Sequence, residues 1–368
     1  MGRVHNLLGY IDRSYSHHLA VKVEKKKISN PIRKKIASDF TLSKEQKDKI
    51  DKLFLDNYGK KVPYDWHQYY SSFSGCFDEN YIPELLFIPE IQRKFVPTEY
   101  AKVFTNKNLL PVLIGGVDNV RTANIIISCE NGVLRNSEME FIDYEQAEKV
   151  LFNIGKVFLK PTTESNSGKG CAVLDLKDGI DQKSGKSVKE ILNNQGKHYN
   201  VQELLINCKS IRDLHPQSIN TFRIVTYIWK NKIFHFPVLF RIAQGKSSLD
   251  NVHQGSLFIG VDDDGTLKKC AFTERGDRYD EHPDSKIKFD GYNIQQVPEM
   301  INAVKKLHKR IPQVGMISWD VTVDENNTIV IVELNIQAQS VRAVQIANGK
   351  GAFGENTAEI LRWISKKQ

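Results

Sequence analysis

Cysteine is scarce in this sequence, and the few cysteines are scattered. The 368 residues contain five, at positions 76, 129, 171, 208 and 270, with no Cys-x-x-Cys pair. An odd number at wide spacing argues against a disulfide framework or a zinc site, and it fits the reducing cytoplasm. We expect these thiols to be small buried apolar side chains.

Long hydrophobic runs are lacking as well. No apolar stretch approaches the roughly 20 residues that a membrane-spanning helix needs. Asp12 and Arg13 interrupt the opening stretch, which argues against a secretory signal, and Asn6 stands where a myristoylation motif needs Ser or Thr. The composition, with 40% hydrophobic and 26% charged residues, is that of an ordinary soluble enzyme with two or three lobes. We expect a cytoplasmic protein.

Acidic residues are under-represented only near the N-terminus. Residues 1–61 contain 15 Lys/Arg and 7 Asp/Glu, so the remaining residues contain 37 of each. The net charge of +8 therefore belongs to a basic arm, and the neutral body gives no reason to expect nucleic-acid binding. The arm could contact a membrane surface weakly or an acidic polymer, but we favour a solvated helical arm folded back on the body. Ser43 and Gln46 form a capping-box pattern that starts a helix.

The next segments predict short elements rather than a repeat. Residues 62–105 are rich in aromatic residues and are divided by Pro83, Pro89 and Pro97, which indicates a packed lobe of short elements. Two strand-like runs follow, Val112–Ile114 and Ala123–Ser128.

Ile317 to Gln337 carries the clearest chemical pattern. Two alternating apolar runs flank a polar cluster at residues 324–328, which predicts a β-hairpin. Folding it brings Asp320 opposite Glu333, and Asn335 shares the face of Glu333 because strand side chains alternate. The alternative is that these acids are ordinary strand residues that face solvent and bind no ligand. Since the flanking runs are apolar enough to be buried, we interpret Asp320, Glu333 and Asn335 as oxygen ligands of a divalent metal.

A polar glycine-containing loop joins two further predicted strands. Val157–Leu159 precedes it and Cys171–Leu176 follows it, while Lys160 places a charge at the first strand's end. Glycines allow backbone amides to approach phosphate oxygens, although about half of such loops are merely turns. The candidate phosphate-binding residues of the loop are Ser165, Ser167, Gly168, Lys169 and Gly170.

Three further features suggest ligand contacts. The strand Asn200–Ile206 offers backbone groups and one acid that could bind an adenine ring. Arg223 and Arg241 lie in apolar strands, where a cation needs an anionic partner, and the pair suggests a phosphate or carboxylate clamp. His282 could be a base or a ligand, although a structural histidine is the more common case.

The order of these pieces from Asn106 to the C-terminus resembles the ATP-grasp superfamily. That resemblance implies that Lys107, in the position of an Asp-Lys pair, and Lys160, in a Lys-Pro pair, bind ATP. It implies that Ser165–Gly170 covers the phosphates and that Asp320, Glu333 and Asn335 hold Mg²⁺. The adenine hinge would be Gln202, Glu203, Leu204 and Leu205, and the ribose contact would be Asn220 or Asp213.

Closer likenesses concern the substrate. The pattern Arg241, Ala243, Gly245, Asn251, His253 and Gly255 is similar to ribosomal-protein glutamate ligases and lysine-biosynthesis ligases. The segments FLKP, NTFRIVT, ISWD and VELN look most like the sugar-transfer-associated ATP-grasp group, which is linked with polysaccharide biosynthesis. The implied substrate-binding residues are Arg241, Asn251, His253 and His282, and the implied catalytic residues are Arg223, Arg241 and Lys160.

The resemblance implies an α+β fold in which two lobes grip ATP. We expect a basic arm over 1–61, an N-terminal lobe over 62–105, a small ATP-grasp lobe over 106–206 and a large lobe over 207–368.

The implied reaction joins a carboxylate to an amine through an acyl phosphate. Both substrates would be small molecules, either sugar-linked or amino acids. It would use ATP and one or two Mg²⁺, with Mn²⁺ as an alternative. A kinase-like phosphotransferase and a nucleotide-binding regulatory protein remain alternatives, and no oligomeric state is indicated.

Overall fold

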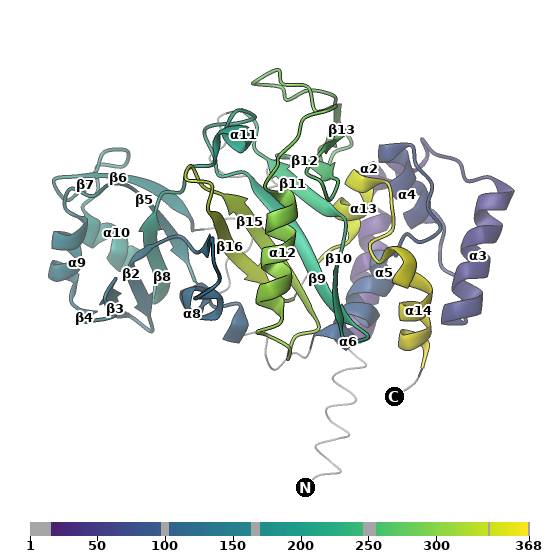
Figure 1. The fold of residues 1–368 in the computed structure, drawn as a ribbon, viewed down its shortest axis with the longest axis horizontal. Coiled ribbons are helices and arrows are strands. Elements are labelled where there is room, and N and C mark those ends of the chain that lie inside the picture. The colour runs from purple at the N-terminus through teal and green to yellow at the C-terminus, as the bar shows by residue number, and fades with distance from the viewer. Residues whose placement is uncertain (1–15, 97–102, 163–169, 246–254, 338, 367–368) are drawn as a thin grey trace, which may run out of the picture.

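Two β-sheets divide the chain into two lobes, which lie side by side at the left and centre of Figure 1. The computed structural model describes residues 16–96, 103–162, 170–245, 255–337 and 339–366. The helices of residues 31–86 lie on the right, at the end of the molecule away from the small lobe. This mixed arrangement of helices with two sheets is the two-lobed α+β architecture that the sequence predicts.

The small lobe contains a seven-stranded sheet in the order β4-β3-β2-β8-β5-β6-β7. Its neighbouring strands are antiparallel, and two helices, each with a side-chain N-cap from Asp143 or Ser187, pack on it around a separate hydrophobic core. Its elements are β2 (Ile125–Glu130), β3 (Val133–Asn136), β4 (Phe141–Ile142), α9 (Tyr144–Leu151), β5 (Gly155–Pro161), β6 (Ala172–Lys177), β7 (Ile180–Asp181), α10 (Val188–Asn194) and β8 (His198–Glu203).

The large lobe contains a nine-stranded sheet in the order β1-β16-β15-β9-β11-β12-β13-β14, with β10 paired to β9. Strand β1 pairs in parallel with β16, although it falls within the segment 106–206 assigned to the small lobe. The strands are β1 (Val120–Arg121), β9 (Thr221–Trp229), β10 (Lys232–His235), β11 (Val238–Ile242), β12 (Leu257–Val261), β13 (Leu267–Phe272), β14 (Arg278–Tyr279), β15 (Met316–Val323) and β16 (Ile329–Asn335).

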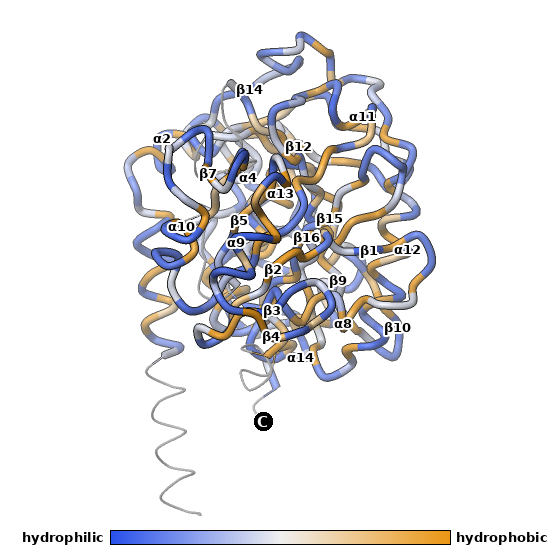
Figure 2. The backbone as a smooth tube through the Cα atoms, turned by 90° about the vertical axis from the view of Figure 1, so that its left-hand side faces the viewer, coloured by the Kyte–Doolittle hydropathy of each residue, from blue (hydrophilic) through white to orange (hydrophobic). Residues whose placement is uncertain are grey.

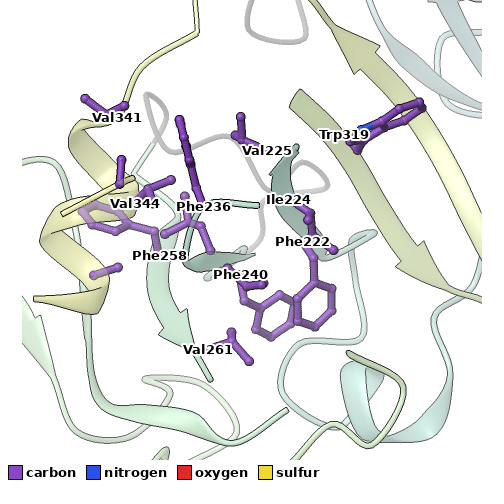
Figure 3. Close-up of a cluster of buried hydrophobic side chains, with 14 of the residues drawn as sticks. Phe222, Ile224, Val225, Phe236, Phe240, Phe258, Val261, Trp319, Val341 and Val344 are labelled. Atoms are coloured by element: carbon purple, nitrogen blue, oxygen red, sulfur yellow. The ribbon is translucent and has the colours of Figure 1, made fainter. Parts of the chain in front are cut away.

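The core of the large lobe lies between its sheet and the covering helices. All eight residues of β15 are buried, as expected for a central strand. Phe222 and Phe240, on neighbouring strands, stack with ring centroids 4.2 Å apart, and Val341 and Val344 approach the same cluster from α13 and its N-cap (Figure 3). The helices of this lobe are α11 (Lys209–Arg212), α12 (Val297–His308), α13 (Arg342–Asn348), η4 (Gly354–Asn356) and α14 (Thr357–Ser365).

The N-terminal helices share the hydrophobic core of the large lobe. Ile50 and Phe54 are buried in it, and Ser43 and Gln46 form both hydrogen bonds of the predicted capping box. Residues 16–28 are helical. The elements that follow are α2 (Pro31–Ala37), α3 (Lys44–Tyr58), α4 (Asp65–Ser74), α5 (Glu84–Leu86), η1 (Phe87–Ile91), α6 (Gln92–Phe95), η2 (Lys107–Leu109) and α8 (Leu110–Ile114).

Two predicted strands differ in the structure. Val112–Ile114 belongs to helix α8, because Pro111 lies in its first turn and Gly115 ends it. The strand predicted over Asn200–Ile206 ends at Glu203, where the chain leaves the small sheet.

Figure 2 shows hydrophobic residues along β2 and β16, each of which is an interior strand of its own sheet. Among the described helices, none combines the length and the apolar character needed to cross a membrane.

Candidate active site

Asp320 lies at the centre of the candidate site. It faces Glu333 on β16 and Arg223 on β9 in direct register, so three neighbouring strands present charged side chains at one level of the sheet. The register shifts immediately after the Asp320–Glu333 pair, which places a β-bulge beside the site. Such bulges redirect side chains near functional sites. The predicted pairing of Asp320 with Glu333 is confirmed.

Two arginines hold the Asp320 carboxylate. Arg223 Nε and Nη2 donate to its two oxygens at 2.9 Å each, and Arg241 Nη2 lies 3.1 Å from Oδ2. Arg241 also donates to Thr221 Oγ1. Burial acts to raise the pKa of Asp320, but the two guanidinium groups outweigh burial and hold that pKa at about 2. Arg223 and Arg241, which the sequence analysis predicts as a clamp for an anion, therefore both contact Asp320, the predicted metal ligand.

Glu333 is the more accessible of the two acids, and it connects the lobes. Its Oε2 lies 3.3 Å from Lys107 Nζ, which comes from the segment before the small sheet. Asn335 Nδ2 donates to Glu333 Oε1 at 3.0 Å, so the amide and the carboxylate share one face as predicted. Lys107, Glu333 and Asn335 thus meet where the two lobes face each other.

Lys160 is buried at the end of β5, with 7% of its surface exposed. Burial lowers its pKa to about 8; Lys107 acts in the same direction, and Glu333 opposes them. Its register partner on β8 is Asn200, whose buried Oδ1 has no hydrogen-bond partner among the described residues. Burial and the nearby Lys107 destabilise the charged form of Lys160. A bound anion would stabilise that charged form, so we expect this position to bind an anion tightly.

Glu130, which the sequence analysis did not identify, ties the segment that carries Lys107 to the end of β5. It accepts hydrogen bonds from Asn106 and Asn108, at 3.1 and 2.7 Å, and from Thr162 at 3.2 Å. His198 Nδ1 lies 2.7 Å away. Burial acts to raise the pKa of Glu130, but these hydrogen bonds outweigh it and lower that pKa. No sequence signal marks this acid, because its partners lie up to 68 residues away.

The substitution Glu130→Gln is expected to raise the KM for ATP about tenfold and to change kcat less. A neutral amide accepts fewer of these hydrogen bonds, so Lys107 would be held less firmly. Steady-state kinetics of ADP release measure both constants. Glu138→Gln, an exposed change in the same lobe, serves as the control and should leave KM unchanged. A fall in kcat at unchanged KM would contradict this positioning role.

The predicted adenine hinge lies at the connection between the lobes. Arg121 forms an ion pair with Glu203 and, at 2.8 Å, with Asp324 in the hairpin turn of the large lobe. Asn124 also donates to Glu203 through its backbone and its amide. The carboxylate of Glu203 is therefore committed to the hinge itself, while the backbone of the hinge, including that of Leu204 and Leu205, stays a candidate adenine contact.

Two predicted contacts do not fit the structure, and a third stays a prediction. Asn220 is fully buried, with its amide bonded to His215 O and its oxygen accepting from Ala243 N, so it cannot reach a ribose. His282 is likewise fully buried and bonds to Ala243 O, and burial lowers its pKa, so it is a structural histidine. Asp213 is exposed and pairs with Lys209 one turn earlier, on α11, so its assignment as the ribose contact stays a prediction.

The remaining predicted residues fall largely outside the described part of the chain. Ser165, Ser167, Gly168 and Lys169, and also Asn251 and His253, lie outside the described residues. Gly170 is described: its φ is +80°, and a Cβ there would lie 2.9 Å from Pro161 Cγ. Only glycine fits such a position easily, so Gly170 lets the chain turn closely past the Lys160–Pro161 strand end. Gln202 is buried on β8.

The donor set fits magnesium with few protein ligands. The described residues contain no group of three or more His, Cys, Asp or Glu side chains that could hold a metal, and the predicted set has two carboxylates and one amide. Mg²⁺ often takes one or two carboxylates and completes its shell with water and phosphate oxygens. Asn335 donates through nitrogen, which leaves its Oδ1 available. Four cationic side chains surround the two acids, which suits a polyphosphate bound with its metal.

The family is established by a match over most of the chain. Residues 89–360 match the model of the sugar-transfer-associated ATP-grasp family. The chain belongs to this family. ATP-grasp proteins use ATP and Mg²⁺, and many are ATP-dependent ligases. The cofactors predicted for this ATP-grasp protein are therefore confirmed at the level of its family.

Solved structures with a similar fold are distant in sequence. The ATP-grasp ligase PsnB complexed with minimal precursor is 10% identical, with a TM-score of 0.41 over 74% of this chain and 63% of that one. Biotin carboxylase from Campylobacter jejuni is 13% identical, with a TM-score of 0.42 over 74% and 49%. L-amino acid ligase from Bacillus licheniformis is 12% identical, with a TM-score of 0.38 over 72% and 48%. The chain thus spans less than two thirds of each of these structures. No curated protein matches the sequence.

Proposed function

We propose that this ATP-grasp protein is an ATP-dependent carboxylate–amine ligase that acts on a sugar acid or an amino acid in polysaccharide or related biosynthesis. The observation that supports it is the charged cluster between the lobes, where Lys107 lies 3.3 Å from Glu333 and two arginines hold Asp320. Cations from both lobes surround two acids there. This arrangement suits a triphosphate, and the nearby arginines suit a second anion.

The two lobes would have different roles in binding ATP and its metal. Lys107 and Lys160 would bind the phosphates from the small lobe, and Asp320, Glu333 and Asn335 would hold Mg²⁺ from the large lobe. When bound, Mg²⁺ would neutralise charge that builds up on the phosphate oxygens. Arg223 and Arg241 would orient the substrate carboxylate, although both are also needed to hold Asp320.

The proposed chemistry has two steps. A carboxylate oxygen of the substrate attacks the γ-phosphorus of ATP, the bond to the bridging oxygen breaks, and ADP leaves as an acyl phosphate forms. The amine nitrogen then attacks the acyl carbon, phosphate leaves and the nitrogen loses a proton, which gives the amide. Phosphoryl transfer depends on positioning and charge neutralisation, which a cationic cluster can supply.

A substrate screen tests the proposal. Amino acids would be combined with uronic acids and amino sugars, with ADP release and the product mass as readouts. ADP release that needs both a carboxylate and an amine, with a product lighter by one water than the two together, would support ligation. A product that gains the mass of one phosphoryl group and keeps it would instead identify a kinase.

The low pKa of Lys160 predicts a pH dependence. Below about pH 8 the ammonium is charged and attracts phosphate; as pH rises through that pKa the charge is lost. We therefore expect kcat/KM for ATP to fall about tenfold per pH unit above pH 8, since this constant reports free-enzyme pKa values. In Lys160→Arg the charge persists, so this fall should disappear, whatever the variant's absolute rate. The same fall in both proteins would contradict the assignment.

A further inference from the structure

The helix over residues 16–28 has two different faces. Ala20, Glu24 and Ile28 turn toward the body, where Glu24 is 2% and Ile28 8% exposed. The opposite face is formed by residues 19, 22, 23 and 26, whose spacing of three and four residues aligns them on one side of a helix. This outer stripe alternates aliphatic and cationic side chains.

The outer stripe exposes hydrophobic surface. Leu19 is 42% exposed and Val23 is 49% exposed. Lys22, Lys25 and Lys26 are exposed beside them. We call Leu19, Lys22, Val23, Lys25 and Lys26 the N-terminal cationic surface.

Negative charge is almost missing from this segment. Residues 16–38, all of which the structure describes, contain seven Lys/Arg and one acid. That acid, Glu24, is buried and lies 2.6 Å from Lys27, so its charge is compensated internally. The surface therefore presents lysine charge to its surroundings, and residues 16–38 contain no exposed acid to neutralise it.

We propose that the N-terminal cationic surface docks on an anionic lipid bilayer. Lysines near such a bilayer are attracted by its surface potential, and their long stems allow adjacent aliphatic side chains to enter the headgroup region. Stable attachment of a peripheral protein needs an electrostatic and an apolar contribution together, and this surface supplies both. A soluble polyanion fits less well, because it would leave Leu19 and Val23 in water, and residues 16–38 contain no Phe, Trp or Tyr to stack on bases.

Vesicle flotation of the full chain tests the proposal. The protein would be mixed with phosphatidylcholine vesicles, with or without phosphatidylglycerol, at low and high salt. We expect binding only with phosphatidylglycerol and weaker binding at high salt. The triple variant K22Q/K25Q/K26Q should bind roughly a hundredfold more weakly, and L19Q/V23Q should also lose affinity.

A matched control comes from the small lobe, at the opposite end of the molecule in Figure 1. K177Q/K183Q/K189Q removes the same charge from exposed positions and should bind like the unmodified protein. Circular dichroism and ATP-dependent ADP release check that all variants are folded. Failure of the unmodified protein to float with phosphatidylglycerol would overturn the proposal. Equal losses of vesicle affinity in the two lysine variants would also overturn it. So would an L19Q/V23Q variant that binds both heparin and vesicles as tightly as the unmodified protein does.

Discussion

Glu333→Gln is expected to lower ATP-dependent ADP release by on the order of a thousandfold while the protein remains folded. The amide keeps the size of the side chain, but it removes the charge that would bind the metal and that now faces Lys107 at 3.3 Å. Glu333 is partly exposed, so losing this pair should cost only about 1 kcal/mol of stability. Initial rates of ADP release and a thermal melt would measure the two effects separately.

Glu325→Gln is the control for this prediction. Glu325 lies in the turn of the same hairpin, is exposed, and is joined to Ile206 only through its backbone N–H in the described hydrogen bonds. Its substitution should change neither the rate nor the melting temperature. If Glu333→Gln retained most of the activity at saturating Mg²⁺, the metal assignment would be wrong.

The hairpin could be predicted because its signals are local. Asp320, Glu333 and Asn335 fall within 16 residues, and strand alternation plus a polar turn is sufficient to place them together. The arginines were predicted for a similar reason: a guanidinium within an apolar strand needs a partner. Their common partner, Asp320, could not be identified from the sequence, because it depends on which strands lie next to β9.

Residues that act through long-range contacts were missed. Glu130 and Arg121 each join elements that are far apart in the chain, as in the Arg121–Asp324 pair, which spans 203 residues. A single acid or arginine in the sequence does not reveal an interaction partner that is far away along the chain. Their importance follows from the way the two sheets meet, which residue spacing does not encode.

Two site assignments were wrong for the same reason. Asn220 and His282 were considered for ligand binding because they are polar and stand in the expected order, yet both are fully buried and bonded to backbone groups. A buried polar side chain satisfies its hydrogen bonds internally, and the sequence does not show which polar residues are buried. The apolar run Val112–Ile114 failed differently: so short a run fits a strand or a helix, and Pro111 decides for the helix.

Asp320→Asn should have a second, structural effect that Glu333→Gln lacks. Asp320 is 3% exposed and accepts from Arg223 and Arg241, which are both partly buried, so removing its charge takes away the buried anion on which the two guanidinium groups converge. Breaking a buried pair in this way typically costs about 3–5 kcal/mol. Urea denaturation should therefore show lower stability, together with loss of ADP release. Asp290→Asn, which removes an exposed 3.7 Å pair with Lys269, should cost less than about 1 kcal/mol.

The pH dependence of this difference identifies its origin. The pKa of Asp320 is about 2 in the folded protein and 3.8 ordinarily, so its charge stabilises the fold above pH 3.8 and this contribution is lost as pH falls toward 2. The stability difference between the unmodified protein and Asp320→Asn should accordingly shrink by about 2 kcal/mol between neutral pH and pH 2. A difference that stayed constant over that range would point to altered packing instead of a lost ion pair. It would then remove the electrostatic reason for placing two arginines beside the metal ligand.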